Sequence, residues 1–262
     1  MDNLRTFHDC ETAPRPVAAL ASEHPDGEHV ASHEHPRAQL IHTLSGVMTV
    51  TSRDGSWVVP PGRAVWMPPR QHHAIRIAGH VSMRTIFVQD GTRCSLPAAC
   101  EVIEVSAFLR EAIVAATLIA LDYAPGGRDE RVMTLILDEI ETAPRLHLHA
   151  PMPRDPRLLG LCERLIADPA APADLEALAA DIHVSGRTLA RMFHREVGMS
   201  FGEWLRRARL LLSLPRLASG ASVLEVALEH GYDSPSAFAA MFRRTLGLSP
   251  TAYLQKAAGR GS

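Results

Sequence analysis

Histidines gather in one short stretch near the start of this 262-residue chain, SHEHPRAQLIH. Side chains alternate between the two faces of a β-strand, so His33, His35 and Gln39 would share one face. His72 and His73 follow later, and because neighbours on a strand point apart, only one of them can join a shared site. Converging imidazoles suit a divalent transition metal such as zinc, nickel, copper or iron. The pattern therefore predicts a metal site with Gln39 as a weaker, neutral ligand.

Two other interpretations of the same histidines remain open. They could hydrogen-bond a small organic effector in a metal-free pocket, or form a pH-sensitive cluster. His42 has the strand parity opposite to that of His33 and His35, so it would point away from them. His72 would point away from His73. We therefore assign His42 and His72 to the surface or to an interface. We expect no catalytic residues, because no acid–base or nucleophile constellation accompanies the imidazoles.

A second set of candidate residues lies in an internal repeat. Residues 176–200 match residues 225–249 at a constant offset of 49 without a gap, and each unit reads as helix, turn and helix. Ser185 and Ser234 are natural N-caps, and apolar residues spaced i, i+3, i+4 give each second helix one buried stripe. The matched pairs include Glu176 with Glu225, Ser185 with Ser234, and Gly198 with Gly247.

The opposite faces of these second helices suit the major groove of DNA. Arginine can bind guanine through two hydrogen bonds, and alanine can contact a thymine methyl group. We expect Arg187 to read a base edge and Arg195 to contact phosphate. The predicted DNA-binding residues are Arg187, Thr188, Arg191 and Arg195 in the first unit and Ser236, Ala237, Ala240 and Arg243 in the second.

The elements around these residues divide the chain into two parts. From Ala38 to Gln89, short apolar segments between turn residues predict β-strands, with a hairpin at Asp54-Gly55. Ser106 would cap the first of two helices, which break at residues 125–127. The second helix shows an apolar face at Val132, Leu135, Ile136 and Ile140. Prolines then mark a domain boundary near residues 150–156.

The C-terminal part resembles the AraC/XylS family of transcription regulators. The stretches LAADIHVSGRTLARMFHREVGMSFGEWLRRARL and VLEVALEHGYDSPSAFAAMFRRTLGLSPTAYL carry the resemblance. It implies a DNA-binding domain over residues 155–256, with helix-turn-helix units at about 175–196 and 224–245 and a joining helix at 201–218. Pro215 departs from the pattern and should kink or shorten the joining helix, because proline cannot donate the helical hydrogen bond.

The N-terminal part resembles the cupin sequence pattern. The first cupin motif fits at Gly27, His33, His35, Gln39 and Gly46, and the second at Gly62, Pro68 and His73. Gln39 stands where the pattern has glutamate, and Arg70 where it has glycine. The resemblance implies a β-barrel over residues 1–105 that places His33, His35, His73 and Gln39 in one interior pocket. Residues 106–150 would then form a helical segment for coupling and dimerisation.

Together these elements and resemblances predict an α+β protein of two parts, and the two parts differ in charge. Residues 1–150 hold 13 basic and 18 acidic residues, whereas residues 151–262 hold 14 basic and 11 acidic, and a mildly basic part is compatible with nucleic acid. Four cysteines without metal or disulfide spacing suit a reducing compartment. With no signal peptide and no apolar run long enough for a bilayer, we expect a cytoplasmic protein without a membrane partner.

These features predict a homodimeric regulator that binds double-stranded promoter DNA under the control of a small molecule or one divalent metal ion. Two alternatives remain at this stage. One is a metal-dependent cupin enzyme fused to a DNA-binding domain, which would turn over a substrate. The other is an architectural DNA-binding protein, whose DNA affinity would not respond to any ligand.

Overall fold

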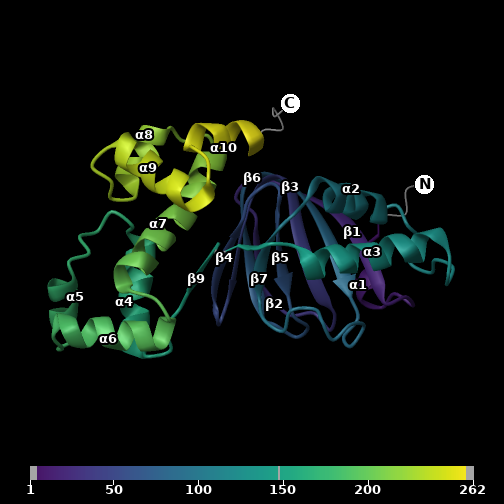
Figure 1. Ribbon diagram of the computed structural model, residues 1–262, viewed down its shortest axis with the longest axis horizontal. Helices are drawn as coiled ribbons and strands as arrows, with labels where there is room; N and C mark the ends of the chain where they lie inside the picture. Colours follow the sequence, from purple (N-terminus) through teal and green to yellow (C-terminus); the bar gives the residue numbers. More distant parts are fainter. Residues whose placement is uncertain (1–4, 147, 258–262) are drawn as a thin grey trace. The chain divides into compact units, whose positions relative to one another are not determined.

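The computed structural model describes residues 5–146 and 148–257, which form two compact units (Figure 1). The first, here called the sheet unit, contains the residues up to His147 except 53–58. The second, the helical unit, contains residues 53–58 and the chain from Leu148 onward. The sequence placed residues 53–58 with the N-terminal strands, so their membership of the helical unit was not predicted.

One antiparallel sheet forms the body of the sheet unit. Its strands follow the order β1-β6-β3-β5-β7-β8, and β2 also pairs with β6. The elements of this unit are α1 (Phe7–Glu11), β1 (Val17–His24), β2 (His29–His33), β3 (Ala38–Ser52), β5 (Arg63–Met67), β6 (His73–Val88), β7 (Glu101–Glu104), α2 (Ala107–Ala116), α3 (Arg128–Thr142) and β8 (Arg145–Leu146). The strand-rich segment thus begins well before Ala38, because β1 and β2 precede it.

The long strands β3 and β6 pair in two stretches separated by irregularities. Ala38–Thr43 pairs with the end of β6, whereas Val47–Ser52 pairs with its beginning. Between these stretches Gly46 adopts φ +67°, and a Cβ there would lie 2.7 Å from the His80 carbonyl oxygen, so glycine is required. The irregularities bend the strand pair, and the two ends of β6 come to lie on opposite walls of one cavity.

Helices α2 and α3 cover one face of the sheet (Figure 1). The Ser106 hydroxyl accepts a hydrogen bond from the Leu109 amide at 3.0 Å, which confirms Ser106 as the cap of α2. The buried stripe of α3 differs from the predicted one. Met133 and Leu137 are buried with Ile136 and Ile140, whereas Leu135 is 39% exposed, because the helix is rotated relative to the predicted face.

His42 lies on this same helix-covered face and is completely buried. The prediction that it lies at the surface or at an interface is wrong, because it is buried within the sheet unit, although its strand parity, opposite to that of Gln39, is right. Its Nδ1 lies 2.8 Å from the Arg63 carbonyl oxygen. Burial lowers the pKa of His42 to about 4, so its neutral form is the stable one in the folded chain.

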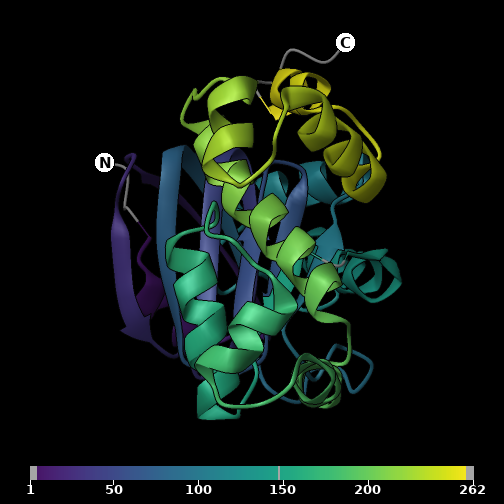
Figure 2. The same ribbon diagram turned by 90° about the vertical axis from the view of Figure 1, so that its left-hand side faces the viewer.

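The helical unit consists of a short strand pair and seven helices within the described residues (Figure 2). Strand β4 pairs with β9, with Trp57 opposite His149. The elements are β4 (Gly55–Val59), β9 (His149–Pro151), α4 (Pro156–Ala167), α5 (Leu175–Asp181), α6 (Gly186–Val197), α7 (Phe201–Ala218), α8 (Val223–Glu229), α9 (Pro235–Leu246) and α10 (Pro250–Ala257). None of the helices in the described part of the chain is both long and apolar enough to cross a bilayer.

The two helix-turn-helix units repeat each other, but not without a gap. Ser185 and Ser234 cap α6 and α9, and both helices end at a left-handed glycine, as an offset of 49 requires. The first helices are instead offset by one residue less, since α5 begins at Leu175 and α8 at Val223. The second turn therefore contains one extra residue, and the predicted equivalence of Glu176 with Glu225 is wrong.

Because of this one-residue shift, Glu176 and Glu225 make different contacts. The Glu176 carboxylate accepts a hydrogen bond from the Gly186 amide at 3.0 Å and thereby ties α5 to the start of α6. Glu225 instead completes a capping box with Ser222 at the start of α8.

Pro215 does not shorten the joining helix. Helix α7 runs through it and ends at Ala218, as the predicted range 201–218 requires. The Ser213 hydroxyl donates to the Leu210 carbonyl at 2.6 Å, one turn before the proline. Packing of Leu210, Leu211, Leu214 and Leu217, all buried, keeps the helix intact around the missing N–H.

The burial of His42 predicts an acid-sensitive sheet unit. Because its folded pKa lies below the ordinary 6.5, its stabilising contribution is complete above pH 6.5 and is lost as the pH falls towards 4. Between pH 7 and 5 this loss should reach roughly 2 kcal/mol. In chelator, wild-type protection of β3 amides against hydrogen exchange should fall more steeply than that of His42→Gln, after correction for intrinsic rates. His72→Gln, at an exposed site, should follow the wild type, and equal slopes for wild type and His42→Gln would contradict the assignment.

Candidate effector pocket and DNA-binding surface

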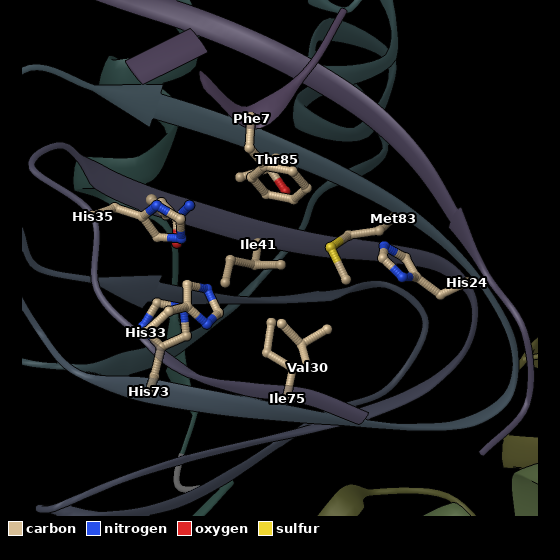
Figure 3. A pocket seen from close by; sticks show the side chains of 11 residues that line it. Phe7, His24, Val30, His33, His35, Ile41, His73, Ile75, Met83 and Thr85 are labelled. Atoms are coloured by element: carbon tan, nitrogen blue, oxygen red, sulfur yellow. The ribbon is translucent and has the colours of Figure 1, made fainter. Parts of the chain in front are cut away.

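A cavity of about 270 Å³ opens in the sheet unit on the face opposite α2 and α3. Figure 3 shows three imidazoles together at one end and His24 with Met83 at the other. Aliphatic side chains fill the middle. The lining residues are Phe7, His24, Val30, His33, His35, Gln39, Ile41, His73, Ile75, Met83 and Thr85.

His33, His35 and His73 form the cluster at one end of this cavity. Their ring centroids are 4.5 Å apart for His33 and His73, 4.7 Å for His33 and His35, and 5.5 Å for His35 and His73. One ring nitrogen from each residue lies within 4.8 Å of the corresponding nitrogens of the other two. Three imidazole nitrogens at this separation can all reach one central ion.

An acceptor holds the Nδ1 atom of each ring. His33 Nδ1 lies 2.7 Å from the Ala31 carbonyl oxygen, and His73 Nδ1 lies 2.8 Å from the Gln71 carbonyl oxygen. His35 Nδ1 bonds to the Glu11 carboxylate. Each Nδ1 therefore carries the proton, which leaves the Nε2 lone pair free.

The free nitrogens explain why the cluster fits a metal. The Nε2 atoms of His35 and His73 are buried without a hydrogen-bond partner in the described part of the chain. Burial also lowers the pKa of His73 to about 4, so this ring stays neutral near pH 7. Neutral imidazoles whose second nitrogen is fixed by an oxygen atom are the arrangement found around protein-bound metals.

The parity argument assumed that His33, His35 and Gln39 lie on one strand, but the cluster is built from two strands and a loop. His33 is the last residue of β2, His35 lies in the following loop, and Gln39 lies on β3. His33 and His73 meet because they are register partners between β2 and β6. Gln39 lines the same cavity, and its Oε1 is buried without a partner among the described residues. The predicted residues are thus brought together, but by strand pairing and a loop.

The N-terminal helix α1 adds two residues that the sequence reasoning missed. Phe7 lines the cavity and stacks on His35 with ring centroids 6.1 Å apart, and Glu11 holds the same imidazole. Arg37 fixes this segment, since its buried guanidinium donates to the carbonyl oxygens of Glu11 and Ala13, among others. The one local signal was the capping box of Thr6 and Asp9, which indicates a helix start but no site.

In the helical unit, the predicted recognition face of α6 is largely open. Arg187, Arg191 and Arg195 are exposed, and within the described residues neither Arg187 nor Arg191 forms an ion pair. Thr188 is half-buried, and its hydroxyl lies 3.0 Å from that of Ser185, so the cap already engages it.

The corresponding face of α9 carries shorter side chains. Ser236, Ala237, Ala240 and Arg243 are all exposed, as predicted from the helical spacing. Arg244 is exposed as well and was not among the predicted residues. The buried stripe of α9 consists of Phe238, Met241 and Phe242.

Two known protein families match this chain, one mainly over the sheet unit and one within the helical unit. Residues 15–184 match the family described as AraC-like ligand binding domain, and residues 178–256 match a helix-turn-helix domain. The chain is 30% identical over 224 residues to the HTH-type transcriptional regulator NimR of Escherichia coli, covering 86% of this chain and 82% of that protein. The chain belongs to the AraC family of transcriptional regulators.

A second regulator is similar over part of the chain. The HTH-type transcriptional regulator RipA of Corynebacterium glutamicum is 32% identical over 131 residues, which cover 50% of this chain and 38% of RipA. Among solved structures, ToxT of Vibrio cholerae aligns over 94% of this chain and 97% of its own, with 10% identity and a TM-score of 0.40.

The expected architecture is confirmed: an N-terminal, sheet-rich ligand-binding domain precedes a C-terminal helix-turn-helix domain. This AraC-family chain is accordingly a DNA-binding transcription regulator and not an enzyme. The enzyme alternative is thereby removed.

Proposed function

We propose that this regulator binds promoter DNA under the control of a divalent transition-metal ion held in the sheet unit. The convergence of His33, His35 and His73 on one point, each with its Nδ1 held by an oxygen, is the observation that supports the metal. Gln39 would serve as a weaker fourth ligand because its amide is neutral. The ion would tie β2, β3 and β6 together and so stabilise one form of the pocket.

A metal-free pocket for an organic effector is the second candidate. It is favoured by the apolar middle of the cavity, where Val30, Ile41, Ile75 and Met83 lie. In that case the unpartnered imidazole nitrogens would hydrogen-bond the effector directly. Metal content of the purified protein separates the two candidates.

We propose that α6 and α9 enter successive major grooves of double-stranded DNA, and that two copies of the chain bind together. On α6, Arg187 would read a base edge and Arg195 would contact phosphate, whereas the small residues of α9 would follow shape and methyl groups. Phe108 and Leu118 are 52% and 86% exposed in the α2 region, and Leu135 of α3 is 39% exposed. Such apolar side chains suit a homodimer interface. Because the proposed target is promoter DNA, we propose a cytoplasmic location.

Replacing Arg187 by alanine should weaken binding to the operator by about 1–3 kcal/mol relative to random DNA, because a base contact would be lost. Arg195→Ala should weaken binding to both DNAs equally, as loss of a phosphate contact would. Electrophoretic mobility shifts at one salt concentration measure both. Arg164→Ala is the control, since Arg164 is an exposed arginine on α4 that pairs with Asp181. An unchanged ratio for Arg187→Ala would refute base reading by this residue.

His33→Ala should lower the affinity for Zn²⁺ at least about tenfold, and Gln39→Glu should raise it by adding a negative charge. Occupancy should fall below about pH 6, because protonated imidazole cannot bind a metal. Competition with a chromophoric chelator and elemental analysis measure these effects. His72→Ala is the matched control, since His72 lies beside His73 but is 70% exposed and pairs with Glu34.

Three outcomes would contradict the proposal. Metal loss in His72→Ala equal to that in His33→Ala would show that the cluster is not the metal site. Purified protein that is metal-free, folded and still responsive to an organic effector would favour the second candidate. DNA affinity that ignores both Zn²⁺ and chelator would mean that metal binding does not control the regulator.

Leu118→Arg should shift the protein towards a monomer in analytical ultracentrifugation, because a charge at a buried interface costs several kcal/mol. Operator affinity should fall with it, since the two copies would no longer bind together. Leu224→Arg is the control, because Leu224 is 53% exposed on α8, outside the proposed interface. A Leu118→Arg protein that remains dimeric would exclude this surface as the interface.

A further inference from the structure

The cavity joins two kinds of surface that a single ligand could use. At one end lie the three imidazoles, and the side chains of Val30, Ile41, Ile75 and Met83 continue from them as an apolar wall (Figure 3). None of the described residues that line the cavity is acidic. A ligand that fills this space therefore meets a nitrogen-rich end and an otherwise apolar interior.

The residues that would hold the metal ion do not balance its charge. A divalent ion held by three imidazoles and an amide would meet only neutral donors, so its two positive charges would stay uncompensated among its direct ligands. The Glu11 carboxylate bonds to the far nitrogen of His35, so it would not be a direct ligand of the ion. Burying uncompensated charge in an apolar cavity is costly, so an anion at this position would be strongly favoured.

Thr85 supplies a hydrogen-bond donor in the middle of the cavity, between His35 and Met83 (Figure 3). Its hydroxyl is buried and has no partner within the described residues, although it lines the cavity. Thr85 pairs with Ile41, and Gln39 pairs with Phe87, so Thr85 and Gln39 are diagonal neighbours across β3 and β6. A buried hydroxyl without a partner is destabilising unless a ligand or water accepts its proton.

The imidazole at the other end is not free to take this role. His24 Nδ1 lies 3.1 Å from the Glu28 carboxylate, and its Nε2 lies 3.0 Å from the Ser22 hydroxyl. Both nitrogens are therefore engaged, and an anionic group gains nothing at that end. The unpartnered polar atoms of the cavity mark one preferred orientation for a ligand.

Resting on the metal proposed above, we infer that the effector is a small organic carboxylate. Its carboxylate binds the metal at a position that the protein leaves open and accepts a hydrogen bond from the Thr85 hydroxyl. First-row ions take roughly four to six ligands, so three imidazoles and Gln39 leave room. The apolar body of the effector lies along Val30, Ile41 and Ile75. A cavity of 270 Å³ exceeds the roughly 150 Å³ that hold a benzene molecule, so one ring with a carboxylate fits.

The full-length protein loaded with Co²⁺ tests this inference, because the visible spectrum of Co²⁺ reports its ligands directly. Benzoate should change the spectrum and saturate. Benzamide, which has the same shape without the charge, should bind at least about tenfold more weakly. Acetate and inorganic phosphate should also bind at least about tenfold more weakly, because they lack the apolar body.

Thr85→Val should weaken benzoate binding about fivefold to tenfold without changing Co²⁺ affinity, because it removes only the hydroxyl. Thr51→Val is the matched control on an exposed position of β3. Equal binding of benzoate and benzamide would overturn the inference while leaving the metal site intact. Equal binding of phosphate and benzoate would show that the site does not select a ligand with an apolar body. An unchanged benzoate affinity in Thr85→Val would show that the Thr85 hydroxyl does not contact the carboxylate. Failure to bind Co²⁺ at all would overturn both this inference and the metal proposal.

Discussion

The sheet unit depends on one constraint, the bend that β3 and β6 share. Each of these strands is more than twice as long as β2 or β5, and a flat pair of that length would have enclosed nothing. The irregular pairing around Gly46 instead turns the two ends of β6 into facing walls. Ile75 and Thr85, which are part of one strand, can line one cavity only because of this bend. The outer face remains free to pack against α2 and α3.

The helical unit was predictable in most of its detail because its signals are local. Serine caps, terminal glycines and i, i+3, i+4 stripes act within one or two turns of helix, and α6, α7 and α9 follow them closely. The errors came from effects that local spacing does not contain. One inserted residue in the second turn displaces α8 relative to the repeat. Packing of α3 against the sheet buries Met133 and Leu137 and leaves Leu135 exposed.

The sequence predicted which histidines line the pocket, but not which strands and loops bring them together. Three histidines and Gln39 were grouped correctly into one cavity, although the argument placed His35 on a strand that had already ended at His33. Parity correctly separated His42 from them, but could not show that α2 and α3 cover the other face and bury it. Glu11 was missed because its contact with His35 depends on how α1 folds back, which residue spacing does not encode.

Residues 53–58 belong to the helical unit although the chain reaches them from inside the sheet unit. They supply the strand partner of β9, and Trp57 stacks on His149 with ring centroids 6.3 Å apart. The Pro151 carbonyl of β9 in turn accepts a 2.9 Å hydrogen bond from the Trp204 indole on α7. The two units are therefore interlaced along the gene. A single recombination in the proline-rich linker after β9 would leave residues 53–58 and β9 with the sensing domain and separate both from the helices that follow. A regulator with exchanged sensing domains would therefore need three crossovers, one at each end of residues 53–58 and one before Leu148, to inherit an intact helical unit.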